Sequence, residues 1–204
     1  MTATRSEARP ATIADTAIVA LDARIGTGTR VWHHAQVREG ARIGRECNVG
    51  KGVYVGAGVV IGDRCKIENN ASLFEGLTLE DGVFVGPHVV FTNDRRPRAT
   101  NPDGTLQTAD DWELGRTTVR RGASLGAGTI VLPGLEIGRY VMVGAGSVVT
   151  RDVPPHSLVV GNPARHIAWI CACGRERSDT PPTAGTELRC ARCGVIEKEG
   201  AATL

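Results

Sequence analysis

The most constraining feature of the sequence is an apolar residue that returns at every sixth position. Fourteen consecutive positions of this period are apolar, and six more follow after one interruption. Apolar residues make up 41% of the chain, so composition alone does not produce such a run. A fixed short period is typical of solenoids, in which each repeat stacks on the next. The two runs are Ile13, Val19, Ile25, Val31, Val37, Ile43, Val49, Val55, Ile61, Ile67, Leu73, Leu79, Val85 and Phe91, then Val119, Leu125, Val131, Ile137, Val143 and Val149.

The other positions of the hexad also have a physical meaning. The fifth is small or apolar in most repeats, so positions one and five both face inward. The fourth is Gly in ten of the twenty hexads and Asn or Asp in four more, and these residues accept a positive φ at a corner. Short strands joined by corners build a parallel β-helix with about 18 residues in each triangular coil. The hexads therefore predict an all-β fold, a parallel β-helix of about seven coils.

The period breaks once and then ends before the chain does. Phe91 and Val119 are 28 residues apart, which is not a multiple of six, so we predict a loop insertion over residues 92–118. The repeats define a β-helix domain over residues 11–168. Residues 169–204 then form a short C-terminal tail.

Charge and composition exclude several kinds of partner. The 204 residues carry 24 Lys+Arg against 22 Asp+Glu, a net charge of +2, which gives no electrostatic reason to expect nucleic acid or a membrane surface. The apolar stretches are too short for a membrane span, and residues 1–10 lack an apolar signal region. We therefore expect a cytoplasmic protein.

Several longer segments resemble one branch of a known family. They are VWHHAQV, KIENNASLFEGLTLEDGVFVGPHVVFTND, RRPRA, RRGASLGAGTIV and LVVGNPARHIAWI. They are similar to hexapeptide-repeat nucleotide-sugar N-acetyltransferases of the WlbB/WbpD type, which acetylate the 3-amino group of UDP-linked 2-acetamido-3-amino uronic acids. Related enzymes act on dTDP-linked 3-amino-deoxyhexoses. The resemblance implies a left-handed helix, acetyl-CoA as cosubstrate, and a homotrimer with active sites between subunits.

Polar residues at the corners are the candidates for positioning the sugar amine. Asn69 and Asn70 share a corner column, and Glu75 stacks one coil from Asn93, where the insertion leaves the helix. We predict that Asn69, Asn70 and Glu75 orient the amino sugar, with Asn93 at the same mouth. The alternatives are structural, because asparagines suit β-helix corners and a lone carboxylate suits a solvated surface.

No histidine stands where the wider superfamily places its base. That base lies in a loop of the form Y-T-x-T-H-P, and FTNDRRP puts Arg96 there, whose guanidinium stays protonated. The resemblance implies direct attack by a positioned amine, and His88, one coil above Asn70, is a candidate sugar contact. Arg95, Arg96 and Arg98 are candidates for binding pyrophosphate or a uronate carboxylate, unless they are only solvated charge.

The second run of hexads, within residues 119–166, is the predicted acetyl-CoA groove. Small side chains let the pantetheine arm lie against the backbone, and arginines at the end of the run suit the phosphates of CoA. Corner and strand geometry alone is an equally good reason for the glycines. The predicted cofactor-binding residues are Gly126, Ala127, Gly144, Ala145, Arg151 and Arg165.

The tail carries two pairs of cysteines, each followed by glycine. Cys171 and Cys173 form a C-x-C pair, and Cys190 and Cys193 form a C-x-x-C pair. Four thiolates suit tetrahedral Zn²⁺, and a tail this short has no core of its own to fold without metal. We predict a structural zinc site in a zinc-ribbon-like tail, with a loosely folded, redox-sensitive tail as the alternative.

Three other functions are compatible with a β-helix. An O-acetyltransferase acting on a sugar or another small acceptor would need a histidine–carboxylate pair, which the insertion lacks. A metalloenzyme similar to the γ-carbonic anhydrases would need paired histidines four or five residues apart, which are absent. A non-catalytic scaffold predicts that no acetyl-CoA binds.

Overall fold

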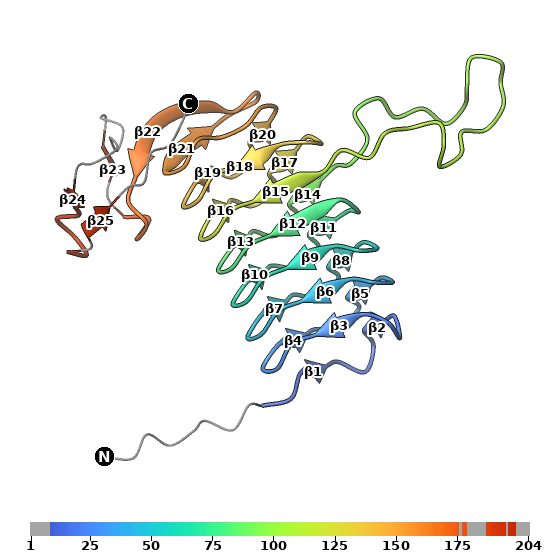
Figure 1. Ribbon diagram of the computed structural model, residues 1–204, viewed down its shortest axis with the longest axis horizontal. Coiled ribbons are helices and arrows are strands. Elements are labelled where there is room, and N and C mark those ends of the chain that lie inside the picture. Colours follow the sequence, from blue (N-terminus) through green and yellow to red (C-terminus); the bar gives the residue numbers. More distant parts are fainter. Residues whose placement is uncertain (1–8, 176, 179–186, 195, 199–204) are drawn as a thin grey trace.

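The structure is a computed structural model that describes residues 9–175, 177–178, 187–194 and 196–198 (Figure 1). All of its labelled elements are β-strands, most of them two residues long. Three sheets of mainly parallel strands form the three sides of a prism, and from β1 to β17 each strand pairs with the strand three positions further along the chain. The parallel β-helix that the hexads predict is therefore confirmed.

Each side of the prism takes one strand from every coil. The first sheet contains β1 (Thr12–Ile13), β4 (Arg30–Val31), β7 (Asn48–Val49), β10 (Lys66–Ile67), β13 (Phe84–Val85), β16 (Ser124–Leu125), β19 (Met142–Val143) and β21 (Ser157–Val160), followed by β22 (Arg165–Ile170) and β23 (Arg177–Ser178). The second sheet contains β2 (Ile18–Val19), β5 (Gln36–Val37), β8 (Tyr54–Val55), β11 (Ser72–Leu73), β14 (Val90–Phe91), β17 (Ile130–Val131) and β20 (Val148–Val149). The third sheet contains β3 (Arg24–Ile25), β6 (Arg42–Ile43), β9 (Val60–Ile61), β12 (Leu77–Leu79), β15 (Thr117–Val119) and β18 (Glu136–Ile137).

The core is built from the two inward positions of the hexad. In a strand, neighbouring side chains point to opposite faces, so the first position faces the core while the residue before it faces out. Ile67 and Leu73 are fully buried at first positions, and Cys65 and Ala71 are almost fully buried at fifth positions. The small fifth-position side chains leave room for the branched residues, which explains how a chain with 4% aromatic residues fills its interior.

The helix is about one coil longer than the twenty hexads predict. Eight strands of the first sheet, from β1 to β21, run parallel. The last of them, β21, is out of the six-residue register, since Val143 pairs with Val159, only 16 residues further on. A search for strict hexads therefore stops one strand early.

Most corners adopt a left-handed backbone at the fourth hexad position. Gly52 and Gly58 have φ values of +67° and +65°, and Asn70 has +58°, as the pattern predicts. Asp22, Asp94 and Asp152, for which the same pattern predicts a positive φ, do not have one. Residues other than Gly, Asn and Asp also adopt it at this position, namely His34, Glu46, Arg64, His88 and Tyr140.

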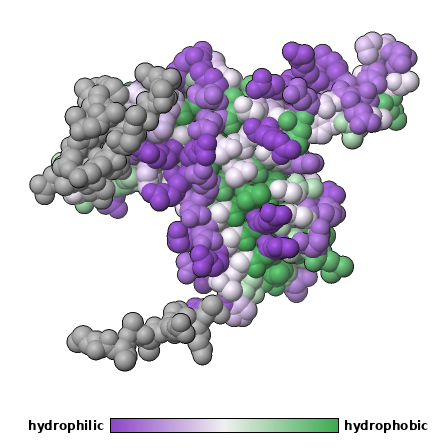
Figure 2. Space-filling model, viewed as in Figure 1, coloured by the Kyte–Doolittle hydropathy of each residue, from purple (hydrophilic) through white to green (hydrophobic). Residues whose placement is uncertain are grey.

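The insertion leaves the helix after β14 and returns at β15. Because β15 begins at Thr117, the chain outside the helix comprises residues 92–116, two fewer than the predicted 92–118. The insertion extends away from the prism as a long arm with mostly hydrophilic side chains (Figures 1 and 2). One antiparallel bridge, between Thr100 and Leu106, closes its outer part.

The C-terminal segments extend the first sheet and then form a separate hairpin. Strand β22 pairs antiparallel with β21, and β23 pairs antiparallel with β22. Strands β24 (Glu187–Arg189) and β25 (Ile196–Lys198) pair with each other. The part of the chain that the structure describes contains no helix long and apolar enough to cross a membrane.

Candidate functional site

The corner between the first and second sheets, which we call the first corner column, holds half of the predicted sugar-binding and cofactor-binding residues. Backbone hydrogen bonds stack its coils: His88 N donates to Asn69 O at 3.0 Å, and Gly128 N donates to Pro87 O at 2.9 Å. Gly146 N donates to Ala127 O at 2.8 Å in the same way. Three of the predicted sugar contacts and the small residues of the predicted acetyl-CoA groove therefore lie on one continuous edge. At or beside this edge are Asn69, Asn70, His88, Gly126, Ala127, Gly144 and Ala145.

Asn69 has a structural role and a free donor group. Its Oδ1 accepts a hydrogen bond of 2.9 Å from the backbone N of Lys51, one coil below. Asp63 and Asp81 use a carboxylate oxygen in the same way at another corner, each at 2.8 Å. The amide Nδ2 of Asn69 has no partner among the described residues, and the side chain is exposed. The hydrogen bond from Lys51 N thus explains the role of the oxygen of Asn69, while its nitrogen is available to a ligand.

The glycines of the groove are required by the stacking of the coils. A Cβ on Gly126 would lie 2.5 Å from the backbone N of Ala145, and one on Gly144 would lie 2.7 Å from Cγ1 of Val160. Both glycines therefore have a structural explanation that does not depend on a ligand. The alanines beside them, Ala127 and Ala145, are exposed, so the edge presents small side chains to solvent.

Glu75 and Asn93 lie at the corner between the second and third sheets, the second corner column. Gly115 N donates to Asn93 O at 2.9 Å, and Thr117 N donates to Gly76 O at 3.1 Å, so both ends of the insertion are fixed beside Glu75. Strand β11 separates this corner from Asn70, a span of roughly 15–20 Å for six residues. Within one chain, Asn69 and Asn70 therefore lie at a different corner from Glu75 and Asn93, so the predicted shared mouth requires two chains.

The arginines of the insertion differ in their surroundings. Arg95 Nε donates to the carbonyl of Pro133 at 3.2 Å, so this side chain helps to hold the arm on the helix. Arg96 and Arg98 are exposed, and Arg98 Nη1 donates to its neighbour Pro97 O at 2.9 Å. An open hollow of about 950 Å³ lies at the root of the arm, lined among others by Arg95, Arg96 and the half-buried Trp112.

Arg151 and Arg165 come together at the C-terminal end of the helix. Both line a cavity of about 130 Å³ that also includes Asp152 and His166. Sequence reasoning did not single out Asp152 or His166 as part of a site. His166 reaches the cavity because β22 turns back antiparallel to β21, an arrangement that a six-residue period does not signal.

The histidines of the described chain differ in burial and in position along the helix. His33 Nδ1 lies 3.5 Å from Asp15 Oδ1 and 2.9 Å from Thr16 Oγ1, but this pair is exposed and lies three coils below His88. His156 is buried and its Nδ1 lies 3.1 Å from the carbonyl of Ile170. His88 also belongs to the first corner column, and it lies one coil above Asn69.

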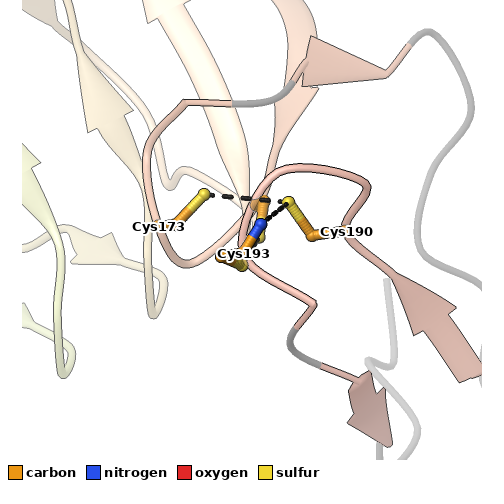
Figure 3. Close-up of side chains that lie close together, drawn as sticks. Cys173, Cys190 and Cys193 are labelled. Atoms are coloured by element: carbon orange, nitrogen blue, oxygen red, sulfur yellow. Dashed lines mark hydrogen bonds between the residues drawn. The ribbon is translucent and has the colours of Figure 1, made fainter.

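The four cysteines of the tail converge and can hold a metal ion. Their sulfurs all lie within 4.8 Å of one another. The side chains of Cys173, Cys190 and Cys193 point toward a common centre in Figure 3. The backbone N–H of Arg175 lowers the pKa of Cys173 to about 7, while burial raises the pKa of Cys171.

Known proteins match the hexapeptide repeats and part of the remaining sequence. Residues 40–75 and 116–151 match the model of the bacterial transferase hexapeptide (six repeats). A 60-residue segment is 55% identical to dTDP-3-amino-3,6-dideoxy-alpha-D-galactopyranose 3-N-acetyltransferase of Aneurinibacillus thermoaerophilus and covers 29% of this chain and 31% of that relative. The chain spans less than half the length of the curated relatives it matches first.

Solved structures show the same fold. A hexapeptide-repeat acetyltransferase from Vibrio cholerae, complexed with acetyl-CoA, is 26% identical with a TM-score of 0.54, over 65% of this chain and 72% of that one. A GDP-perosamine N-acetyltransferase from Caulobacter crescentus, in complex with CoA and GDP-perosamine, is 24% identical with a TM-score of 0.50. It covers 78% of this chain and 57% of that chain, and at this identity the likeness concerns the fold alone.

Proposed function

We propose that the chain is an acetyl-CoA-dependent sugar N-acetyltransferase of the hexapeptide-repeat type, whose family model matches residues 40–75 and 116–151. Its acceptor is the 3-amino group of a UDP- or dTDP-linked amino sugar. The observation that carries this proposal is the segment 55% identical to a dTDP-3-amino-3,6-dideoxyhexose 3-N-acetyltransferase. The acetyltransferase from Vibrio cholerae with bound acetyl-CoA supports the choice of donor.

Acetyl-CoA runs along the first corner column in this proposal. The exposed Ala127 and Ala145 leave the backbone open to the pantetheine arm, one and two coils above His88. Arg151 and Arg165, which line one cavity at the end of the helix, supply positive charge for the phosphates. The thioester then lies near Asn69 and His88, where the sugar amine must be held.

The transfer needs positioning more than a protein base. The unprotonated amine attacks the thioester carbonyl, the new C–N bond replaces the C–S bond, and the proton of the amine passes to the leaving CoA sulfur. Holding amine and thioester in line supplies much of the acceleration, and a backbone N–H of the corner stabilises the oxyanion. The free Nδ2 of Asn69 is placed to orient the sugar, with Asn70 beside it.

Three chains pack through the second sheet in this proposal. Five of its seven outward residues are apolar or aromatic, whereas the third sheet has one such residue, Val60, among six. Ile18 and Ile130 are 67% and 39% exposed there, a pattern that suits a face covered by another copy of the chain. The second sheet lies between the two corner columns. Packing through it brings the first corner of one subunit toward the second corner of the next, with Glu75 and Asn93.

A thiol-release assay with a panel of acceptors tests the proposed function. The panel contains UDP- and dTDP-linked 3-amino sugars, the matching 3-hydroxy sugars, a galactoside and serine. We expect CoA release with a nucleotide-linked amine and none with its hydroxyl counterpart. Faster release with a hydroxyl acceptor would establish O-acetylation instead. If neither CoA nor acetyl-CoA raises the melting temperature, the chain is a scaffold and not a transferase.

A further inference from the structure

The cysteine cluster lies outside the proposed acetyltransfer site and joins two separate hairpins. Cys171 and Cys173 lie in the turn between β22 and β23. Cys190 and Cys193 lie in the turn between β24 and β25. Each turn therefore contributes two sulfurs, and the four cysteine side chains meet between the two hairpins.

Two of the distances between sulfurs equal those of a zinc tetrahedron, and all four sulfurs lie within 4.8 Å of one another. A zinc ion with four Zn–S bonds of about 2.3 Å sets neighbouring sulfurs about 3.8 Å apart. Cys171 Sγ and Cys193 Sγ are 3.8 Å apart, and Cys173 Sγ and Cys190 Sγ are also 3.8 Å apart. A disulfide would need about 2.05 Å, and none of the six cysteines forms one.

Both turns are built alike, as two halves of one site. Gly174 N donates to Cys171 O at 2.7 Å, and Gly194 N donates to Cys190 O at 2.9 Å. These glycines have φ values of +70° and +68°, which a residue with a side chain rarely adopts, so each turn curls back over its cysteine pair. Cys193 N donates to Cys190 Sγ at 3.4 Å, the kind of outer hydrogen bond that orients a metal thiolate.

We propose that Cys171, Cys173, Cys190 and Cys193 bind one Zn²⁺ ion that fastens the C-terminal hairpin to the end of the β-helix. Four thiolates in a tetrahedron suit zinc, whereas calcium and magnesium require oxygen ligands. The complex carries a formal charge of −2, and the exposed Arg175 and Arg192 lie within two residues of a ligand to offset it.

The zinc site is connected to the last coil by defined contacts. Ile170, directly before Cys171, donates its N–H to His156 O at 2.7 Å, and His156 is buried. A Cβ on Gly174 would meet Cε of Met142 at 3.1 Å, so the first turn packs against the outer face of β19. Strand β22 covers the open edge of β21. The metal thus holds the second hairpin to β22, the strand that extends the first sheet beyond β21.

Metal analysis of the full-length protein, purified reduced and without chelator, tests this proposal. We expect one zinc per chain, and the absorption of a tetrahedral cobalt thiolate after exchange with Co²⁺. Cys190→Ser and, separately, the exposed Cys193→Ser should lose both signals. Cys47→Ser is the matched control, because Cys47 is buried in the helix and its sulfur donates to Gly62 O at 3.1 Å, as a hydroxyl can.

Hydrogen exchange separates the tail from the helix. Removing zinc should increase exchange in residues 187–198 and leave the central coils protected, and adding zinc should restore protection. Zinc absent from the purified chain together with no cobalt spectrum would overturn the proposal. So would stoichiometric iron in place of zinc, or a disulfide between these cysteines in the freshly purified protein. None of these outcomes depends on whether the chain transfers acetyl groups.

Discussion

Asn69 and Glu75 provide a direct test of sites shared between subunits. They occupy different corners of one chain, so they serve one site only if two chains contribute. Asn69→Asp removes the amide nitrogen but keeps an oxygen for Lys51 N, as Asp63 does for Arg45 N. Glu75→Gln removes the charge of an exposed side chain without changing its size. Both variants should therefore fold.

The expected activities follow from counting sites. Each variant alone should lose at least tenfold in kcat/KM, a free-energy change of about 1.4 kcal/mol in the transition state. In trimers assembled at random from equal amounts of both, a site is intact when its first chain carries Asn69 and its second carries Glu75. Each condition holds for half the chains, so about one quarter of all sites, and about one third of the sites in trimers that contain both variants, should regain full activity.

Co-expression of the two variants with different tags, followed by purification of mixed assemblies, gives the measurement. Turnover at saturating substrate should rise well above the mean of the separate variants. Assemblies mixed from two tagged copies of the same variant are the control and should show no rise. If mass spectrometry shows mixed trimers but turnover equals the mean of the variants, the two residues do not share an intersubunit site. If Asn69→Asp alone has normal turnover, the amide nitrogen of Asn69 has no role in the reaction, and Asn69 acts only through its structural hydrogen bond to Lys51 N.

Three further changes test the stacking, the base and the assembly. Gly56→Ala should cost about 2–3 kcal/mol of unfolding free energy in urea, because its Cβ would lie 2.8 Å from a backbone nitrogen of the next coil. Gly58→Ala, with φ +65° and no atom within 4 Å, should cost only about 1 kcal/mol, and the reverse order would contradict this account of the glycines. In His88→Asn the new residue also tolerates a φ of +59°, so the variant should fold. We expect its kcat to fall less than tenfold. A hundredfold loss of kcat together with a flattened pH–rate profile would identify His88 as the base. Ile130→Glu should reduce the trimer to monomers in sedimentation, while Val60→Glu on the third sheet should leave its mass unchanged.

The repeating part of the fold was predictable because each hexad has the same pattern of inward-facing and corner residues. An inward branched residue, a small inward residue and a corner residue recur, so the register of the three sheets follows from counting. The same counting places Asn69 below His88, which the structure confirms. It also separates Asn69 from Glu75, since six residues are one third of a coil, so a mouth shared by the two residues requires two chains.

The end of the helix was harder to predict because its contacts do not repeat. Strand β21 returns after 16 residues, and β22 reverses direction to pair with it. No periodic signal marks such a reversal, so His166 was missed beside Arg165. The cysteine spacing did identify the tail site, because metal ligands in sequence pairs depend on local turns rather than on the register of the helix.

Corners, rather than strands, are where a helix of this kind can carry chemistry. In the two-residue strands one side chain faces the core and the other faces outward, and where a glycine follows a strand, the coil above leaves no room for a side chain. The corner residues combine exposure with a backbone position that is set by the stack, as Asn69 and His88 do. Two such columns border the apolar second sheet. Covering that sheet with a second chain would bury its exposed isoleucines and, in the same step, bring the two columns together. Assembly would then bury the apolar face and complete the site together, since the site would be complete only in the assembly.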